Sequence, residues 1–129
     1  MKHIKYLVIF LVIISTSCTK QPKLEGLNLE KWRSDKGGCS GERTQAIEKL
    51  KSLKDEIKGV SSNDLDDYLG TPDVQQLADR NQEYYVYFLE KGIHCETLQK
   101  PSEARSMAVR FSAMGMATEV TFQKGVPNQ

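Results

Sequence analysis

The sequence predicts a small α+β domain, in which two N-terminal helices pack on one face of a three-stranded antiparallel meander (order ααβββ). Residues 41–59 place apolar side chains at helical spacing. Residues 84–92 form an aromatic and β-branched run, and residues 105–125 contain two segments in which apolar and polar side chains alternate. Helices laid on one face of the sheet would bury both apolar sets.

The first 17 residues are predicted to be an export signal. Lys2 and Lys5 give it a positive start, and nine apolar residues follow from Tyr6 to Ile14. A run of this length is typical of the apolar part of a signal peptide and is well short of the roughly 20 residues that span a bilayer. Three small residues then precede Cys18.

Small residues directly before Cys18 resemble the lipobox of bacterial lipoproteins, in which the signal is removed and the cysteine is joined to a diacylglycerol. Ser15 replaces the usual Leu, as in the serine-rich lipoboxes of Bacteroidetes-type bacteria. Two or three acyl chains anchor a protein stably. We therefore expect Cys18 to be the lipidated first residue of the mature chain. Thr19, in place of Asp, favours the outer membrane. An ordinary secretory signal cut elsewhere is the alternative, and it would leave Cys18 as a free thiol.

The rest of the chain has the size of one domain. We expect a signal peptide at 1–17, the lipidated cysteine and a tether at 18–35, a single α+β domain at 36–125 and a tail at 126–129. Removal of the signal leaves 112 residues, with 16 basic and 17 acidic side chains, and a net charge of −1. This balance gives no electrostatic case for binding nucleic acid. Protein or small-molecule partners are expected instead.

Cys39 and Cys95 are the other two cysteines. In a small exported domain such a pair predicts a disulfide. With a sequence separation of 56 between the two cysteines, the bond would stabilise the fold by about 4 kcal/mol in the chain-entropy model. The alternatives are free thiols and a metal site, since His94 is adjacent to Cys95. Two cysteines and one histidine fall short of a closed structural zinc site, so we expect no metal ion and no cofactor.

Two helices are predicted before the strands. The first covers residues 41–59, with lysines and glutamates on its polar face, and Gly59 ends it. Ser61, with Asp64 three residues later, resembles a capping box that begins a second helix, which Gly70 ends. The acidic residues near this start lack the spacing of a calcium loop and favour the positive end of the helix dipole.

Three strands are predicted after residues 73–82, which are polar and have no clear pattern. The aromatic run at 84–92 is expected to be a central strand. Residues 105–115 and 118–125 alternate apolar and polar side chains around a turn near Gly115. A period of two in both segments predicts an antiparallel hairpin with one buried face.

The order of these elements, together with IKGVSSNDLDDYLGTPDV at residues 57–74, resembles the small outer-membrane lipoproteins of the SmpA/OmlA (BamE-like) family. The residues that match the family pattern are Gly59, Val60, Ser61, Leu69, Gly70, Pro72, Tyr85, Tyr87, Val109, Phe111, Gly115 and Val120. The resemblance covers residues 45–123 and implies the same fold and a part in outer-membrane barrel assembly. β-lactamase inhibitor proteins share the ααβββ plan, so a periplasmic ligand binder or enzyme inhibitor is the alternative.

No pattern in the sequence predicts an enzyme. After export His94 is the only histidine, and the glycines form no phosphate-binding loop. We expect a non-catalytic protein-binding module of the cell envelope, lipid-anchored in the outer membrane with its domain facing the periplasm. Aromatic and arginine side chains supply most anchors of protein interfaces. The candidate binding residues are therefore Trp32, Tyr85, Tyr87 and Arg110, although packing within the domain is the favoured interpretation of the three aromatic side chains.

Overall fold

The computed structural model describes residues 20–97 and 99–127. The predicted signal at 1–17 and the predicted lipidation site Cys18 lie outside these residues. The described chain is α+β, as predicted, with five helices and one four-stranded antiparallel sheet. The helices are α2 (Leu29–Ser34), α3 (Glu42–Gln45), α4 (Ile47–Ser52), α5 (Lys54–Ile57) and α6 (Ser62–Leu69), and the strands are β1 (Val74–Leu77), β2 (Glu83–Phe88), β3 (Arg105–Phe111) and β4 (Ala117–Lys124).

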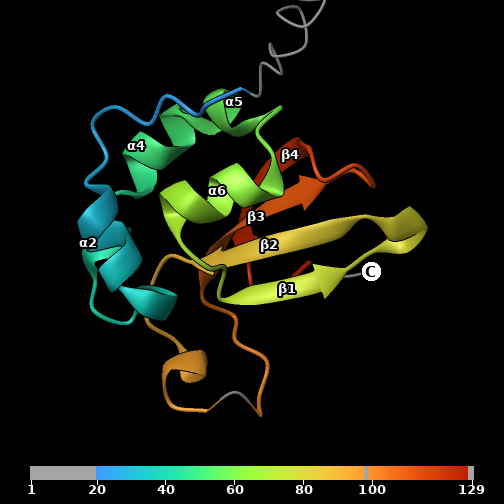
Figure 1. Cartoon of the computed structure of the whole chain (residues 1–129). Coiled ribbons are helices and arrows are strands. Elements are labelled where there is room, and N and C mark those ends of the chain that lie inside the picture. Colours follow the sequence, from blue (N-terminus) through green and yellow to red (C-terminus); the bar gives the residue numbers. More distant parts are fainter. Residues whose placement is uncertain (1–19, 98, 128–129) are drawn as a thin grey trace, which may run out of the picture.

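The sheet is a meander with strand order β1-β2-β3-β4. Helices α4, α5 and α6 lie over one face of it, and α2 lies beside them (Figure 1). Three short 3₁₀ helices complete the described chain, namely η1 (Lys36–Gly38), η2 (Asp79–Asn81) and η3 (Ile93–Cys95). We call the two faces of the sheet the helix-covered face and the helix-free face.

The single first helix predicted for residues 41–59 is wrong, because this segment forms the three short helices α3, α4 and α5. The breaks fall at Ala46 and Leu53, whose N–H groups donate to the carbonyls of Arg43 and Leu50, three residues earlier. Such bonds tighten a helical turn and change its direction. The predicted apolar spacing survives these bends, since both Leu50 and Ile57 are fully buried.

The prediction of three strands is also wrong, because residues 74–77, which lie in the segment without a clear pattern, form a fourth strand, β1. This strand pairs antiparallel with β2, with Val74 opposite Val86 and Leu77 opposite Glu83. It lies at the edge of the sheet, and its residues alternate between half-buried and exposed. An edge strand of this kind needs no apolar stripe, so the period-two pattern that marks the other strands is missing from its sequence.

The core lies between the helices and the helix-covered face of the sheet. The second predicted helix is confirmed as α6, where the Ser61 hydroxyl accepts a hydrogen bond from the Asp64 N–H at 3.1 Å and Gly70 follows the last helical residue. The fully buried apolar side chains come from both predicted apolar sets: Leu50, Ile57, Val60, Leu65, Leu69, Val86, Tyr87, Met107, Val109 and Phe111. All of them except Val86 belong to this core cluster.

The helix-free face is covered by loops. Val86, Phe88, Ser106 and Ala108 are buried, although they alternate with the core residues along β2 and β3 and therefore point away from the helices. The segment of residues 92–97 lies against this face at Phe88, whose ring stacks on His94. The chain after β4 also covers it, because the Ser106 hydroxyl donates a hydrogen bond to the Gly125 carbonyl.

The segment predicted as a tether packs on the domain from its first described residue. We call residues 20–28 the N-terminal arm, which runs along the helices in Figure 1. Leu24 is buried against the core, and the helix that follows the arm, α2, buries Trp32. The indole N–H of Trp32 donates to the Leu69 carbonyl at 3.0 Å, so α2 is joined to the end of α6.

Candidate functional site

A disulfide joins Cys39 to Cys95, as predicted, with the sulfur atoms 1.97 Å and the Cα atoms 6.0 Å apart. Cys39 directly follows η1, in the segment that leads into the helices, and Cys95 is the last residue of η3 in the loop on the helix-free face. The bond therefore holds this loop to the helical layer. It is the centre of the site that we describe below.

A buried guanidinium fixes the segment that carries Cys39. Arg43 is 1 % exposed, and its Nη1 lies 2.7 Å from Oδ2 of Asp73. Its Nε donates to the Trp32 carbonyl at 3.1 Å, and the guanidinium lies 4.7 Å from the centre of the Trp32 ring. Because a buried charge is stable only when it is paired and hydrogen-bonded, these contacts confine Arg43 to one position.

Two carboxylates complete this cluster. Asp35 is 1 % exposed and accepts hydrogen bonds from the backbone N–H groups of Ser40 at 2.7 Å and Arg43 at 2.9 Å. Asp73 accepts from the N–H of Gly37 at 3.0 Å and from the N–H of Phe88 at 2.7 Å. The segment that carries Cys39 and the end of β2 are thus held by charge-assisted bonds, which are among the strong ones in proteins.

His94 bridges the two segments that the disulfide joins. Its Nε2 lies 2.7 Å from the Gly37 carbonyl, and its Nδ1 lies 2.7 Å from the Ser102 hydroxyl. A carbonyl only accepts, so Nε2 carries the proton of the neutral ring, and Nδ1 accepts from Ser102. The ring also stacks on Phe88, with the centroids 3.8 Å apart. All polar atoms of the imidazole are therefore engaged.

Glycine is required where these segments meet. A Cβ on Gly38, which has a φ of +67°, would lie 2.8 Å from the backbone nitrogen of Glu90 and 2.9 Å from the Phe88 carbonyl oxygen. Real Cβ atoms essentially never approach backbone atoms so closely. The Gly37-Gly38 pair therefore allows the chain before Cys39 to lie directly on the end of β2.

The same cluster contains three groups that bind metals in other settings. Ligand atoms of Cys39, His94 and Cys95 lie within 4.8 Å of one another. The thiolate is the form of cysteine that binds metals, and here the two sulfur atoms are joined to each other. In the oxidised protein the cluster can therefore act as a covalent staple with a supporting histidine.

The hydrogen bond from Ser102 to His94 has the length of a nucleophile–base contact. However, Ser102 is 7 % exposed, and its oxygen also accepts a hydrogen bond from the Ala104 N–H at 3.3 Å. A nucleophile must reach the substrate, and this oxygen is occupied by the loop itself. We assign the pair a structural role.

A cavity of about 440 Å³ opens beside the disulfide on the helix-free face. This volume lies within the range of about 300–1,000 Å³ that is typical of small-molecule sites. Val74, Phe88 and Val126 give it apolar walls, while Lys36 and Lys100 supply positive charge. The lining fits a small ligand that combines an apolar body with a negative charge.

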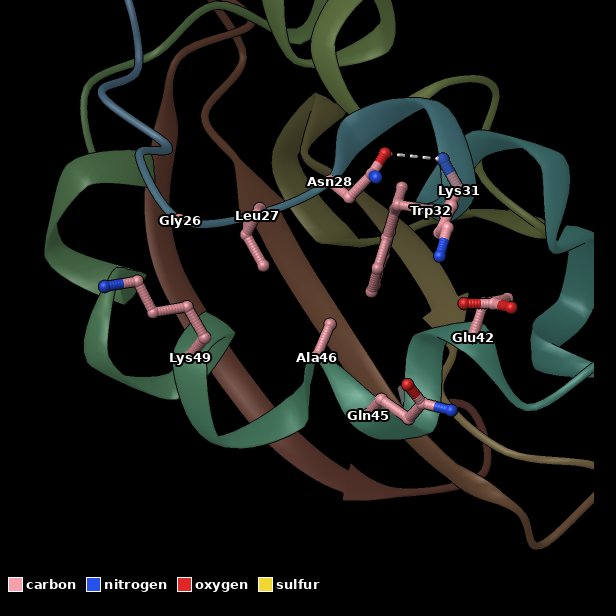
Figure 2. Close-up of a pocket in the computed structure, with 9 residues that line it drawn as sticks. All are labelled: Gly26, Leu27, Asn28, Lys31, Trp32, Glu42, Gln45, Ala46 and Lys49. Carbon is pink, nitrogen blue, oxygen red and sulfur yellow. Dashed lines mark hydrogen bonds between the residues drawn. The ribbon is translucent and has the colours of Figure 1, made fainter.

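A second cavity lies at the C-terminal end of the arm, between α2 and the helices α3 and α4 (Figure 2). Figure 2 shows Leu27, Trp32 and Ala46 on its inner side and Lys49 at its mouth. Its volume of about 220 Å³ is below the usual range for ligand sites. We regard it as a packing gap beside the arm rather than as a binding site.

The structure places three of the four predicted binding residues in the core. Trp32 is 2 % exposed, Tyr85 8 % and Tyr87 0 %. Burial raises the pKa of both tyrosines, with smaller contributions from nearby carboxylates, and the Tyr87 hydroxyl donates to the Gly70 carbonyl at 2.9 Å. Since their rings contact the protein itself, we correct the expectation that they anchor a partner.

Arg110 is the exception, because it is half-buried on the helix-free face. It lies in a row across all four strands, in which Gln76 is opposite Tyr84, Tyr84 opposite Arg110 and Arg110 opposite Glu119. Its guanidinium lies 5.8 Å from the centre of the Tyr84 ring, and its Nε donates to Gln82. We call Gln76, Tyr84, Arg110 and Glu119 the cross-strand row.

Sequence reasoning missed the charge cluster, although one signal pointed to it. Helical spacing places Arg43 on the same face as Ile47 and Leu50, among apolar side chains. A charged group on such a face requires a buried partner. The partner Asp73 could not be found in this way, because it comes from a segment outside the predicted helices.

Among the residues that the structure describes, no helix is long and apolar enough to cross a bilayer. No family model, no curated protein and no solved structure matches the chain.

Proposed function

We propose that this chain is a lipid-anchored, non-catalytic protein-binding module of a bacterial cell envelope, held in the outer membrane through Cys18 with its domain in the periplasm. The observation that carries the proposal is the Cys39–Cys95 disulfide. Disulfides persist in oxidising compartments and are rare in reducing ones. This favours export, which the sequence at 1–17 predicts independently.

The cross-strand row is the proposed contact surface. Tyr84 and Arg110 are side chains of the types that dominate interface energies, and both are half-buried on a face without helices. The Oε1 atom of Gln76 in the same row is buried and has no hydrogen-bond partner among the described residues. An unpaired buried acceptor costs about 1–3 kcal/mol, so the fold leaves a polar group of this row unsatisfied.

A part in outer-membrane assembly is the specific form of this proposal, and it rests on the resemblance of residues 45–123 to the SmpA/OmlA (BamE-like) family. A periplasmic ligand binder or inhibitor is the second candidate. The cavity of about 440 Å³ beside the disulfide favours it, because a pure scaffold has no need of an open pocket with apolar walls and a positive rim.

Metabolic labelling with a radioactive fatty acid tests the anchor. The wild-type chain should take up label, and Cys18→Ala should not. A double variant, Cys39→Ser with Cys95→Ser, is the matched control, because it removes two cysteines and should keep the label. A wild-type chain without label would exclude the lipid anchor.

Photo-crosslinking in intact cells tests the contact surface. A photoreactive residue in place of Tyr84 should capture a defined envelope protein, whereas one in place of Glu48, which is exposed on α4, should not. Arg110→Ala should weaken the capture at position 84. An outer-membrane barrel protein among the products favours assembly, and a secreted hydrolase favours the inhibitor. The same products from both positions would contradict the proposed surface.

A further inference from the structure

The N-terminal arm is fastened to α5 at its first described residue. The Lys20 Nζ lies 2.6 Å from the Lys58 carbonyl and 3.3 Å from the Asp55 carbonyl. Carbonyl groups at the end of a helix have no helical partner and attract a cation. The ammonium group of Lys20 supplies this cation.

The next residues of the arm are also fastened. The Tyr68 hydroxyl donates to the Gln21 side chain at 3.2 Å, and both Pro22 and Leu24 are buried. Further along, Gly26 has a φ of +86°, and a Cβ there would lie 2.5 Å from a side-chain carbon of Lys49. The arm therefore follows one path over the helices from residue 20 onward.

This path leaves very little free chain before the domain. Cys18 is two residues from Lys20, so their Cα atoms are at most about 7 Å apart. A flexible tether over all of 18–35 would instead have a root-mean-square length of about 23 Å. The polar layer of each leaflet is about 5–8 Å thick, so a lipid on Cys18 would draw Lys20 to the headgroups.

We propose that α5 and the first residues of the arm form a membrane-facing surface that contacts phospholipid headgroups, and that the disulfide pocket points away from the bilayer. This inference rests on the lipid anchor proposed above. The arm and α5 lie at one end of the molecule and η3 at the other (Figure 1). A domain of this size has a radius of gyration of about 13 Å, so η3 stands on the order of 30 Å from the membrane.

The charges at this end suit zwitterionic headgroups. Lys54, Asp55 and Lys58 are exposed on and beside α5, and Lys58 lies 3.4 Å from Asp55. A surface that carries both signs can pair with the amine and the phosphate of phosphatidylethanolamine. Its orientation is set mainly by the short chain to Cys18 and only secondarily by charge.

The inference can be tested on vesicles of phosphatidylcholine and phosphatidylethanolamine. In the oxidised chain without its signal, Cys18 is the only free thiol and can be coupled to a maleimide lipid. A dye is introduced through a keto amino acid, either as Lys54→p-acetylphenylalanine on α5 or as Glu96→p-acetylphenylalanine beside η3. The energy acceptor on the headgroups is chosen so that its Förster distance with the dye is shorter than the separation between η3 and the membrane. The dye at position 54 should then lose most of its emission, and the dye at 96 should retain most of it.

A flexible insertion of twelve residues between Thr19 and Lys20 is the control, and it should reduce the difference between the two positions. Equal loss at both positions in the chain without the insertion would overturn the inference. This outcome is distinct from failure of the proposed function. Absence of fatty-acid label in cells removes the anchor, whereas equal loss on vesicles removes only the orientation.

Discussion

The two faces of the sheet are held by different kinds of interaction. On the helix-covered face, apolar side chains such as Leu65 and Phe111 are fully buried, and the charge cluster around Arg43 ties the neighbouring segments to the sheet. On the helix-free face, the segments 92–97 and 99–103 are held by one disulfide, by His94 and by a few hydrogen bonds, and a cavity remains open there.

This difference separates stability from function. Close apolar packing gives the helix-covered face most of the stability of the domain, since apolar burial is the dominant favourable contribution to folding. The helix-free face contains fewer apolar contacts and more exposed loop, which are the properties of regions that open locally and bind partners. We therefore expect perturbations of the first face to unfold the domain and perturbations of the second to loosen a loop.

The largest effect is expected from Arg43→Met, which leaves the largely buried carboxylate of Asp73 without its counter-charge. Breaking a buried ion pair from one side costs about 3–5 kcal/mol, and urea unfolding measures it. Arg105→Met is the matched control, because its salt bridge to Glu90 is partly exposed and contributes less than about 1 kcal/mol. Equal losses of unfolding free energy in the two variants would show that burial of Arg43 does not strengthen its contribution to stability.

Loss of the disulfide should show most clearly that the two faces differ in local stability. The double variant Cys39→Ser with Cys95→Ser is expected to lose about 2–4 kcal/mol. Hydrogen exchange should become faster in residues 93–97, whereas the amides of α6 and β3 should keep their relative protection. A uniform loss of protection would mean that the disulfide holds both faces.

Gly38 lies where the two faces meet, and Gly41 provides its control. Both have positive φ, at +67° and +87°, so alanine adds about 1–2 kcal/mol of backbone strain at either position. A Cβ at 38 would also clash with backbone atoms, whereas a Cβ at 41 would have nothing within 4 Å. Gly38→Ala should therefore be less stable than Gly41→Ala by about 1–3 kcal/mol, as measured by thermal unfolding.

The smallest effect concerns Tyr87, whose pKa burial raises well above its ordinary value of 10.0. The folded protein keeps this proton at pH values where the unfolded chain loses it, so stability is present below about pH 10 and falls as the pH rises further. Tyr87→Phe should lose about 1 kcal/mol at pH 7, because the hydrogen bond to Gly70 disappears.

Above pH 10 the stability of Tyr87→Phe should fall less steeply than that of the wild type, as alkaline denaturation followed by circular dichroism would show. Tyr84→Phe is the control at pH 7, because it removes a hydroxyl from the helix-free face and should leave the unfolding free energy nearly unchanged. If the stability of Tyr87→Phe fell with pH as steeply as that of the wild type, groups other than Tyr87 would be responsible for the alkaline transition.

Local patterns were sufficient to predict part of this molecule. Alternation in residues 106–112 predicted β3, although both of its faces are buried rather than one, the Ser61 cap predicted the start of α6, and a pair of cysteines in a small domain predicted the disulfide. Each of these depends on neighbouring residues or on composition. The polar strand β1 carries no such pattern, because its backbone pairs only with β2 at the edge of the sheet.

By itself the sequence determined the α+β class, the two apolar sets and the pair of cysteines, because period and composition act within a segment. Only the tertiary structure decided that Trp32 and Tyr87 are core residues, that Arg43 pairs with Asp73, and that the N-terminal arm lies on α5. These contacts join residues that are distant in the chain. Their free energy depends on burial, and burial exists only once the helices and the sheet have packed together.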